Sequence, residues 1–494
     1  MTGRVVLIGA GPGDPGLLTI RGRDLLSRCD VVIYDALVSD TLLSIAPQNA
    51  RCIYVGKRAR SHARPQPEIN EMLVQEAKAG HFVVRLKGGD PFLFGRGGEE
   101  ALYLAEHGIP FEIVPGVSAL TAVPACAGIP VTERDLSSCL IAVTGHEDPS
   151  KSESALDWSR IAKVPGTLIL FMGIHNLPVI VKDLLEAGRS PETPAAVIRY
   201  GTLPEQHTLL GTLADINDRV EKAGLRPPAL VIIGEVVGLR DRLNWFETRP
   251  LFGRTVVVTR PRKQAERIYT MLTDLGASVL AAPMIRTVSP TDSAPLRKAV
   301  RELDRYDWIV FSSTNGVDGF FKVLAEEGGD ARWLAPCRIA AVGPATEESL
   351  LARTVVPDLM PSQFSSDGLA EALSGTDSIS GRRILHPCSS IAPENLADNL
   401  RSLGATVERV EAYSIVPEDD CNLDWDPIPD AITFASPSAA TYFMDRVAPE
   451  HLEELKAKTV FASIGPATTA RMIELDLPVQ IQASEHTAAG LVEA

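Results

Sequence analysis

Short apolar runs that end near glycine or proline alternate with longer amphipathic stretches along the chain. In the first half these runs are residues 5–10, 31–34, 82–86, 140–143, 168–172 and 230–233. Runs of this length are typical of buried strands, and amphipathic stretches are typical of helices that cover a sheet. The pattern therefore predicts an α/β fold.

Length and charge limit the classes of protein to consider. The chain has 494 residues, enough for two to four domains of about 150 residues each. Hydrophobic residues make up 45% and charged residues 22%, which predicts folded domains rather than disorder. The net charge of −15 argues against a nucleic-acid partner or an anionic membrane partner. An acidic ligand must therefore meet a local group of basic residues.

Seven cysteines are scattered along the sequence without a CxxC pair. Such spacing favours reduced thiols in the cytoplasm and predicts neither a metal site nor a disulfide framework. No targeting sequence precedes the first apolar run, and no run reaches the roughly 18 residues of a membrane span. We expect a cytoplasmic protein without bound metal.

A change of pattern near residues 247–252 divides the chain, because a new strand begins at about residue 255. We predict domains at residues 1–247 and 253–494. The second contains an internal repeat: residues 309–315 resemble 432–438, and residues 341–346 resemble 463–468. The second pair of segments carries a Gly-Pro turn and a threonine suited to cap a helix. Two copies predict two α/β lobes facing each other across a cleft, at about 253–287 plus 418–494 and about 290–412.

Two glycine-rich loops each follow a predicted strand of the first half, at residues 9–14 and 88–90. Glycine lets a backbone approach a ligand closely. The first loop has Asp14 where a dinucleotide fingerprint needs glycine, so it does not favour NAD. A tight turn is the simpler explanation for each loop alone. Together they predict one pocket for a polar cofactor.

Further motifs at residues 34–35, 55–58, 114–116 and 128–132 complete a recognisable set with these loops. Residues 3–246 thereby resemble uroporphyrinogen-III C-methyltransferase, a member of the tetrapyrrole methylases. The resemblance implies a fold of two α/β subdomains, with S-adenosylmethionine bound in the cleft between them. It also implies a homodimer that forms through this domain.

The resemblance assigns site residues by position. It implies a cofactor site formed by Pro12, Gly88, Gly89, Asp90, Leu93, Ser118, Ala119, Met172 and Gly201. Leu93 and Ser118 stand where the family often has isoleucine and threonine, and they keep the apolar volume and the hydroxyl.

Asp35 and Lys57 match the family's proton acceptor and proton donor. A carboxylate fits this chemistry, because the pyrrole ring gains positive charge when its carbon attacks the methyl group and must later lose a proton. The residues alone leave other roles open. Asp35 is equally well placed to cap a turn or helix, and Lys57 to anchor a substrate carboxylate.

Residues 57–64 hold four positive charges and no acid in a chain that is acidic overall. A solvated loop is one interpretation. The other is that Arg58, together with Arg96, binds the eight carboxylates of a porphyrinogen, because arginine binds carboxylates in a bidentate manner. Arg85 and Lys87 would extend this surface.

The second half, residues 253–494, resembles uroporphyrinogen-III synthase through the doubled strand motifs and residues 410–413. The resemblance implies substrate binding by Ser313, Thr346, Ser436 and Thr468, and assistance by the Tyr413 phenol to a departing hydroxyl. Capping is an equally open role for the two threonines. His386 and Cys388 suggest a nucleophile, although a partly buried turn is the better interpretation.

We therefore expect a bifunctional enzyme, a methyltransferase and a lyase of porphyrin biosynthesis on the way to sirohaem or cobalamin. It would close hydroxymethylbilane to uroporphyrinogen III with loss of water and methylate this product twice to give precorrin-2. No preceding segment suggests the NAD-dependent module of some sirohaem synthases. Two alternatives are a methyltransferase for a later corrin intermediate and a methyltransferase fused to a non-catalytic tetrapyrrole-binding lobe.

Overall fold

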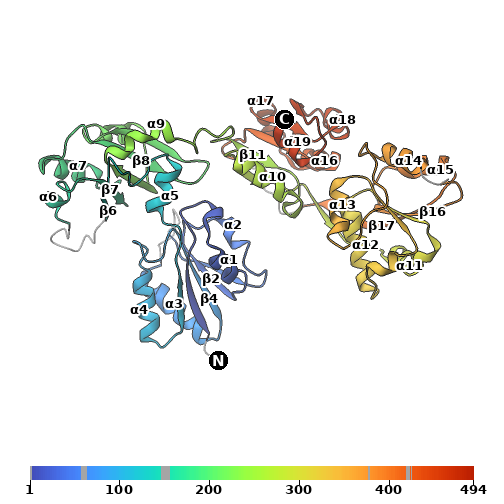
Figure 1. Cartoon of the computed structure of the whole chain (residues 1–494), viewed down its shortest axis with the longest axis horizontal. Helices are drawn as coiled ribbons and strands as arrows, with labels where there is room; N and C mark the ends of the chain where they lie inside the picture. Colours follow the sequence, from blue (N-terminus) through green and yellow to red (C-terminus); the bar gives the residue numbers. More distant parts are fainter. Residues whose placement is uncertain (1–2, 57–63, 146–155, 376–378, 419–422, 424) are drawn as a thin grey trace. The chain divides into compact units, whose positions relative to one another are not determined.

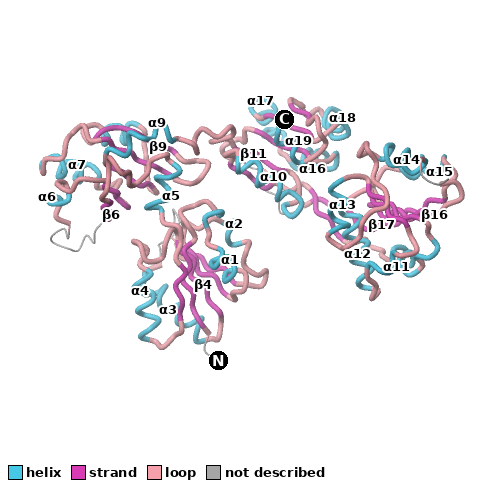
Figure 2. The backbone as a smooth tube through the Cα atoms, in the orientation of Figure 1, coloured by secondary structure: helices cyan, strands magenta, loops and turns pink. Residues whose placement is uncertain are grey.

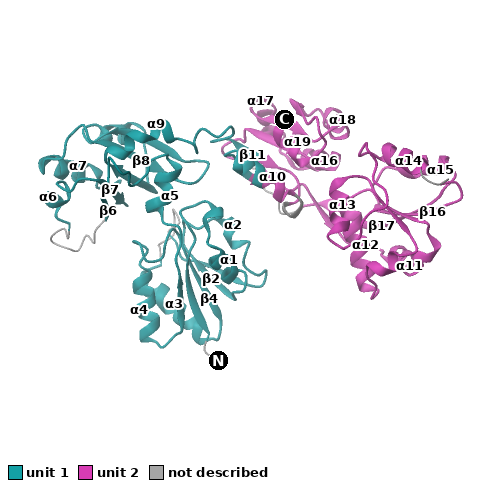
Figure 3. Cartoon of the chain, viewed as in Figure 1, with its two compact units in different colours: residues 1–256, 270–279 teal, residues 257–269, 280–494 magenta. Residues whose placement is uncertain are grey.

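The computed structural model describes residues 3–56, 64–145, 156–375, 379–418, 423 and 425–494. Contacts divide the chain into two compact units, residues 1–256 with 270–279 and residues 257–269 with 280–494 (Figure 3). Strands and helices alternate in both, as Figure 2 shows, and the predicted α/β class is confirmed. The predicted domain limits at 247 and 253 remain a prediction.

The first sheet of unit 1 is parallel, with strand order β3-β2-β4-β1-β5. Its strands are β1 (Arg4–Gly9), β2 (Val31–Tyr34), β3 (Arg51–Tyr54), β4 (Phe82–Lys87) and β5 (Phe111–Val114). The helices are α1 (Ile20–Leu26), α2 (Asp40–Leu43), α3 (Gln66–Lys78), α4 (Gly97–Glu106) and α5 (Ala119–Cys126). Both faces are buried: α1 and α2 cover one, and α3 and α4 cover the other (Figures 1 and 2).

The strand order of this sheet reverses between β1 and β4. The chain leaves β1 toward α1 on one face and leaves β4 toward α4 on the opposite face. Diverging connections of this kind open a crevice at the carboxyl ends of the strands, where open α/β sheets bind ligands. Both predicted glycine loops lie at this position.

The second sheet of unit 1 is mixed, with strand order β6-β7-β10-β8-β9. Its strands are β6 (Leu140–Thr144), β7 (Thr167–Phe171), β8 (Pro194–Arg199), β9 (His207–Thr212) and β10 (Ala229–Ile233). The helices are α6 (Trp158–Ile161), α7 (Leu177–Glu186), α8 (Ile216–Lys222) and α9 (Arg240–Leu243). Helices α7 and α8 cover one face, and α5 contributes to the core on the other.

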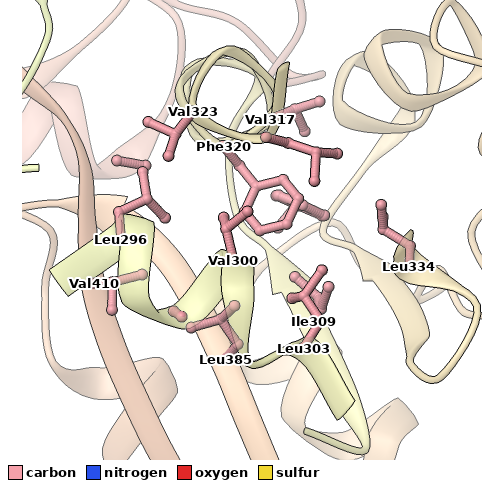
Figure 4. Packing of buried hydrophobic residues seen from close by; sticks show 14 of the residues in the cluster. Leu296, Val300, Leu303, Ile309, Val317, Phe320, Val323, Leu334, Leu385 and Val410 are labelled. Carbon is pink, nitrogen blue, oxygen red and sulfur yellow. The ribbon is translucent and has the colours of Figure 1, made fainter. Parts of the chain in front are cut away.

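The third sheet has strand order β13-β17-β16-β14-β15. Its strands are β13 (Ile285–Val288), β14 (Trp308–Phe311), β15 (Arg338–Ala341), β16 (Arg383–Ser389) and β17 (Thr406–Pro417). The helices are α11 (Ala294–Arg301), α12 (Thr314–Glu326), α13 (Pro344–Leu351), α14 (Ser366–Ser374) and α15 (Asn395–Ser402). Figure 4 shows α11 and α12 packed on one face through Val300, Phe320 and their neighbours. Helices α14 and α15 cover the opposite face.

The fourth sheet has strand order β12-β11-β18-β19-β20. Its strands are β11 (Thr255–Val258), β12 (Ser278–Ala281), β18 (Ala431–Phe434), β19 (Val460–Ser463) and β20 (Ile481–Gln482). The helices are α10 (Arg262–Asp274), α16 (Pro437–Arg446), α17 (Pro449–Lys458), α18 (Pro466–Glu474) and α19 (Ala488–Glu493). Phe434, Phe443 and Phe461 form the centre of its core.

The internal repeat corresponds to equivalent elements of these two sheets. Ser313 at the start of α12 and Ser436 at the start of α16 each accept a hydrogen bond from a backbone N–H of the first turn. The predicted threonine caps are wrong. Gly343 and Gly465 occupy the cap positions of α13 and α18, because the proline that follows each glycine starts the helix. Thr346 and Thr468 lie inside the helices and are buried.

One strand differs from the predicted lobe limits. β13 falls within the residues assigned to the first lobe, but it pairs antiparallel with β17 in the sheet of the second. The two strands that connect the lobes therefore form one ribbon, and this ribbon extends the second sheet.

Candidate active sites

The two glycine loops of unit 1 are joined directly. The Gly89 N–H donates a 2.7 Å hydrogen bond to the Gly11 carbonyl, and the Gly11 N–H donates a 3.3 Å bond to the Gly89 carbonyl. The carboxyl ends of β1 and β4 thus share one backbone surface. The structure brings the two loops together, as the sequence predicts.

A third loop, which follows β5, lies against the first two. A Cβ atom added at Gly116 would overlap the Gly89 carbonyl and lie 2.6 Å from the Gly9 Cα atom. Asp90 fixes this arrangement: its Oδ2 accepts a 3.0 Å hydrogen bond from the Gly116 N–H, and its Oδ1 accepts a 2.8 Å bond from the Phe92 N–H. The predicted cofactor residue Asp90 therefore also ties two loops together.

The remaining predicted cofactor residues approach the same loops. Ser118 caps α5, and the Ala119 nitrogen lies 4.0 Å from a Cβ atom built on Gly89. Gly201 packs on Val123 of α5 so closely that an added Cβ atom would overlap it. The Asp14 N–H, two residues beyond Pro12, donates a 3.2 Å hydrogen bond to the Thr202 hydroxyl. Loops from both sheets of unit 1 therefore meet here.

Strained backbone gathers at this site. Among the described residues, the non-glycine residues with positive φ in unit 1 are Phe94, Arg96, Met172, Tyr200 and Thr202. Phe94 follows the β4 loop, and its ring lies 4.9 Å from the ring of Phe171, which directly precedes Met172. The predicted cofactor residues Leu93 and Met172 therefore belong to neighbouring segments, and Met172 is half exposed. Strain of this kind persists mainly at functional sites.

Asp35 belongs to a network of four ion-paired side chains, and it is the member that reaches the surface while the other three are buried. It follows β2 and accepts a 2.6 Å hydrogen bond from Nη2 of Arg85. Arg85 donates from Nε to Oε1 of Glu100 at 2.9 Å, and the same oxygen accepts from Lys87 Nζ at 3.0 Å. Burial lowers the pKa of Lys87, with a further contribution from the charge of Arg85. An ion pair, rather than the predicted cap, is the side-chain contact observed for Asp35.

The predicted basic surface is partly wrong. Arg85 and Lys87 are 1% and 3% exposed, because their cations are paired with Glu100 inside the protein. They therefore cannot form a surface for substrate carboxylates. Arg96 is exposed and forms two hydrogen bonds with Glu99, at 2.8 and 2.7 Å. Lys57 and Arg58 lie outside the described residues.

In the third sheet, the Tyr413 hydroxyl lies 3.1 Å from the Ser313 hydroxyl. A bulge in the pairing of β16 with β17 accounts for this position, because Cys388 pairs with Glu411 and the next pair is Ser389 with Tyr413. In a regular strand consecutive side chains point to opposite faces of the sheet, but Ala412 and Tyr413 both pack in the cluster under α12. Bulges redirect side chains in this way next to active sites.

Sequence reasoning missed a second polar pair at the same edge. Nε2 of His386 lies 2.8 Å from the Ser312 hydroxyl. His386 and Cys388 do not form the predicted turn: they belong to β16 and are buried. Burial, with a further contribution from the positive charge of Arg409, lowers the pKa of His386 to about 4. The sequence signal was the two consecutive serines at the end of β14, whose side chains must point to opposite faces of the sheet.

Among the residues that the structure describes, no helix is long and apolar enough to cross a membrane. The same residues hold no cluster of three or more His, Cys, Asp or Glu side chains able to bind a metal ion.

The folds and sites define an α/β enzyme chain with separate candidate sites at the carboxyl ends of parallel strands. Residues 4–217 match the family model of Tetrapyrrole (Corrin/Porphyrin) Methylases, and residues 266–493 match that of Uroporphyrinogen-III synthase HemD. Each matched segment contains one of the candidate sites.

Three relatives match different shares of the chain. A porphyrin biosynthesis protein HemD of Ruminiclostridium josui is 37% identical over 83% of this chain and 81% of the relative. A uroporphyrinogen-III C-methyltransferase of Bacillus subtilis is 39% identical over 72% of this chain and 74% of the relative. A uroporphyrinogen-III C-methyltransferase of Methanocaldococcus jannaschii is 50% identical over 49% of this chain and 99% of the relative.

The chain belongs to the family that joins a uroporphyrinogen-III C-methyltransferase to a uroporphyrinogen-III synthase. The predicted resemblance and both enzyme classes are confirmed.

Proposed function

We propose that this chain carries out two consecutive reactions of tetrapyrrole biosynthesis. The synthase part closes hydroxymethylbilane to uroporphyrinogen III, and the methyltransferase part transfers two methyl groups to that product to give precorrin-2. The observation that carries the proposal is the presence of two separate sites, one of glycine loops and one of paired hydroxyl groups, each within a segment that matches the corresponding family.

The residues at the glycine loops fit S-adenosylmethionine. The loops after β1, β4 and β5 approach one another closely at glycine residues, so they leave N–H and C=O groups close to a bound ligand. Phe92, Phe94 and Met172 present exposed apolar side chains nearby, which suits an adenosyl group with a sulfonium centre. S-adenosylmethionine, when bound, supplies an electrophilic methyl group.

Asp35 supplies the base in our proposal. Arg85 holds one carboxylate oxygen of Asp35 and leaves the other for the substrate. The carboxylate stabilises the positive charge that develops on the pyrrole ring and then accepts the proton that the ring carbon loses. The neighbouring charges are already paired, so little reorganisation accompanies the reaction.

Tyr413 assists the departing hydroxyl of hydroxymethylbilane. The Ser313 oxygen accepts a hydrogen bond from the Gly316 N–H, and in our proposal its O–H donates to the phenol oxygen of Tyr413. The phenol O–H then transfers its proton to the leaving oxygen, which departs as water, and the phenolate regains a proton when the substrate releases one on ring closure. Hydroxyl and backbone groups at the ends of β14 and β15, including Thr346, orient the flexible chain for ring closure. Ser436 and Thr468 serve the same purpose on the fourth sheet.

Arg58, Lys57 and Arg96 complete the proposal as carboxylate contacts of the methyltransferase site. We also propose that the protein is a cytoplasmic homodimer that needs no NAD and no metal. The reduced state of the described cysteines supports the location. Light scattering of the purified protein measures the oligomeric state.

The decisive experiment is an anaerobic incubation of the whole protein with hydroxymethylbilane and labelled S-adenosylmethionine. Two methyl groups on the type III macrocycle are expected. Unmethylated type III product would contradict the methyltransferase assignment. Type I product alone would contradict the synthase assignment and leave the second half as a binding lobe.

A further inference from the structure

The strand order of the third sheet reverses between β14 and β16. The chain leaves β14 into α12, which packs on one face through Val317 and Phe320 (Figure 4). It leaves β16 toward α15, which packs on the opposite face through Leu396 and Leu400. The diverging connections open a crevice at the carboxyl ends of these two strands, the usual ligand position in such sheets.

Two consecutive serines directly follow β14 at this crevice, and each pairs with a different strand. Ser313 approaches Tyr413 of β17 at 3.1 Å. Ser312 approaches Nε2 of His386 of β16 at 2.8 Å, so this pair bridges the two strands where the order reverses. The Ser312 and His386 pair is therefore a second polar contact beside the candidate catalytic phenol.

The surroundings of His386 determine where its ring proton lies. The side chain is almost wholly buried, and its lowered pKa of about 4 keeps the ring neutral near pH 7. A neutral imidazole carries one N–H. Arg409 is the register partner of His386 on β17, but Nδ1 of the ring has no hydrogen-bond partner among the described residues. A buried N–H without an acceptor is rarer than a buried acceptor without a donor, which favours an unprotonated Nδ1. The proton then lies on Nε2, which donates to the Ser312 oxygen.

Two buried atoms of these partners lack a hydrogen bond among the residues that the structure describes: Nδ1 of His386 and Nε of Arg409. A buried polar group without a partner costs about 1–3 kcal/mol and is rare in folded proteins. The two groups therefore contribute a cost, not a gain, to the stability of the fold. An apolar side chain of similar size would avoid it.

We propose that His386 is a positioning residue of the synthase site, which donates from Nε2 to Ser312 and so directs the Ser312 O–H proton toward an oxygen atom of the tetrapyrrole substrate. This inference rests on the proposed synthase function and deepens it. Ser312 acts as a second donor beside Tyr413 and holds the flexible substrate in the geometry for ring closure.

Four variants of the whole chain test the proposal: Ser312→Ala, His386→Leu, their double variant and His386→Gln. We expect each of the first two to lower kcat/KM for type III ring closure about tenfold, the effect of one lost hydrogen bond to a substrate. The double variant should lose no more than either single variant, because both act through one hydroxyl. His386→Gln should restore most of the activity, since its amide donates from a similar position.

Two controls accompany these variants. Methylation of supplied uroporphyrinogen III by the same preparations should stay unchanged. Ile384→Val changes a buried side chain of the same strand, in the cluster under α14 and α15, and should leave ring closure unchanged. If the parent is active while Ser312→Ala and His386→Leu keep its ring-closure rate, or if their losses add in the double variant, the proposal is overturned. If the parent yields only the type I isomer, both the synthase function and this proposal are overturned.

A measurement that does not depend on activity reads the tautomer. Nitrogen-15 NMR of histidine-labelled protein, with His386 assigned by its absence in His386→Gln, should show a neutral ring protonated on Nε2 from pH 8 to pH 5. A ring protonated on Nδ1 would overturn the proposal even if the variants lose activity. A His386→Leu chain that fails to fold would leave Ser312→Ala, His386→Gln and the NMR spectrum to decide.

Discussion

The Arg85 guanidinium donates a 2.6 Å hydrogen bond from Nη2 to Oδ1 of Asp35. Arg85 is 1% exposed, whereas about a third of the Asp35 side chain reaches the surface. The carboxylate is therefore held from inside the protein and open to a ligand from outside. A group fixed in this way is positioned before a substrate arrives, which is what proton transfer from a bound intermediate requires.

Replacing Asp35 by asparagine removes the proposed base and keeps the size of the side chain. We expect methyl transfer to uroporphyrinogen III to fall about 100-fold, the lower range of general acid–base effects. The control Asp40→Asn changes a carboxylate in the first turn of α2 and should not alter the rate. Transfer of labelled methyl groups measures the effect, and full activity of Asp35→Asn would reduce Asp35 to a partner of Arg85.

Glu100→Gln tests the buried charges. Glu100 is fully buried and pairs with both Arg85 and Lys87 through one oxygen. Arg85 keeps its pair with Asp35, so the cation left without an ion-pair partner is the buried Lys87, and we expect a loss of about 3 kcal/mol in the free energy of unfolding. Glu99→Gln breaks an exposed pair with Arg96 and should cost less than about 1 kcal/mol. Hydrogen exchange of β4 and α4 across a urea series measures both, and equal losses would contradict the account.

Gly116→Ala tests the contact of the three loops. The added methyl group would displace the Gly89 carbonyl and the Gly9 backbone, so we expect the affinity for S-adenosylhomocysteine to fall more than about tenfold, since such a site depends on close backbone approach. Gly238→Ala is the matched control, because a Cβ atom there meets nothing within 4 Å. Calorimetric titration measures both. Equal affinities would show that the loops do not form the site.

Tyr413→Phe removes the phenol oxygen that pairs with Ser313. Ring closure to the type III isomer should slow about 100-fold, because the departing hydroxyl loses its donor. Tyr306→Phe removes another phenol from the same apolar cluster and should leave the rate unchanged. Methylation of supplied uroporphyrinogen III should be equal in both variants. A Tyr413→Phe enzyme as fast as Tyr306→Phe would exclude the phenol from the reaction.

Acid should destabilise the third sheet through His386. Its pKa is about 4 in the folded protein and 6.5 when unperturbed, so between these values the unfolded chain binds more protons. The free energy of unfolding therefore falls as the pH drops through this window, by about 2 kcal/mol at pH 5. Between pH 7 and pH 5 the free energy of unfolding of the His386→Gln variant should therefore fall by about 2 kcal/mol less than that of the parent protein. Hydrogen exchange of β16 in urea at both pH values measures the difference, and parallel losses would contradict the prediction.

Local sequence predicted the strands and the loops of this protein with little help from tertiary contacts. Apolar runs such as 5–10 and 31–34 became β1 and β2, and the glycine motifs of residues 9–14 and 88–90 became two adjoining loops. The prediction succeeded because glycine at a close backbone approach and a continuous apolar run of strand length are properties of a few consecutive residues.

The role of charged residues was less predictable. Arg85 and Lys87 looked like surface cations, although they alternate with apolar residues in a strand that is buried on both faces. Their partner Glu100 lies on α4, and only the packing of that helix on β4 brings the carboxylate to them. The threonine caps failed for a local reason instead, since proline at the first helical position moves the cap to the preceding glycine.

The sequence by itself determined the α/β class, the two family resemblances and the segments that carry the candidate sites, because these depend on composition, periodicity and motifs along the chain. Only the tertiary structure decided that Arg85 supports Asp35, that a bulge brings Tyr413 to Ser313, and that His386 faces Ser312. Each of these contacts joins residues 50 or more positions apart. Their pairing depends on strand order and register, which no local pattern encodes.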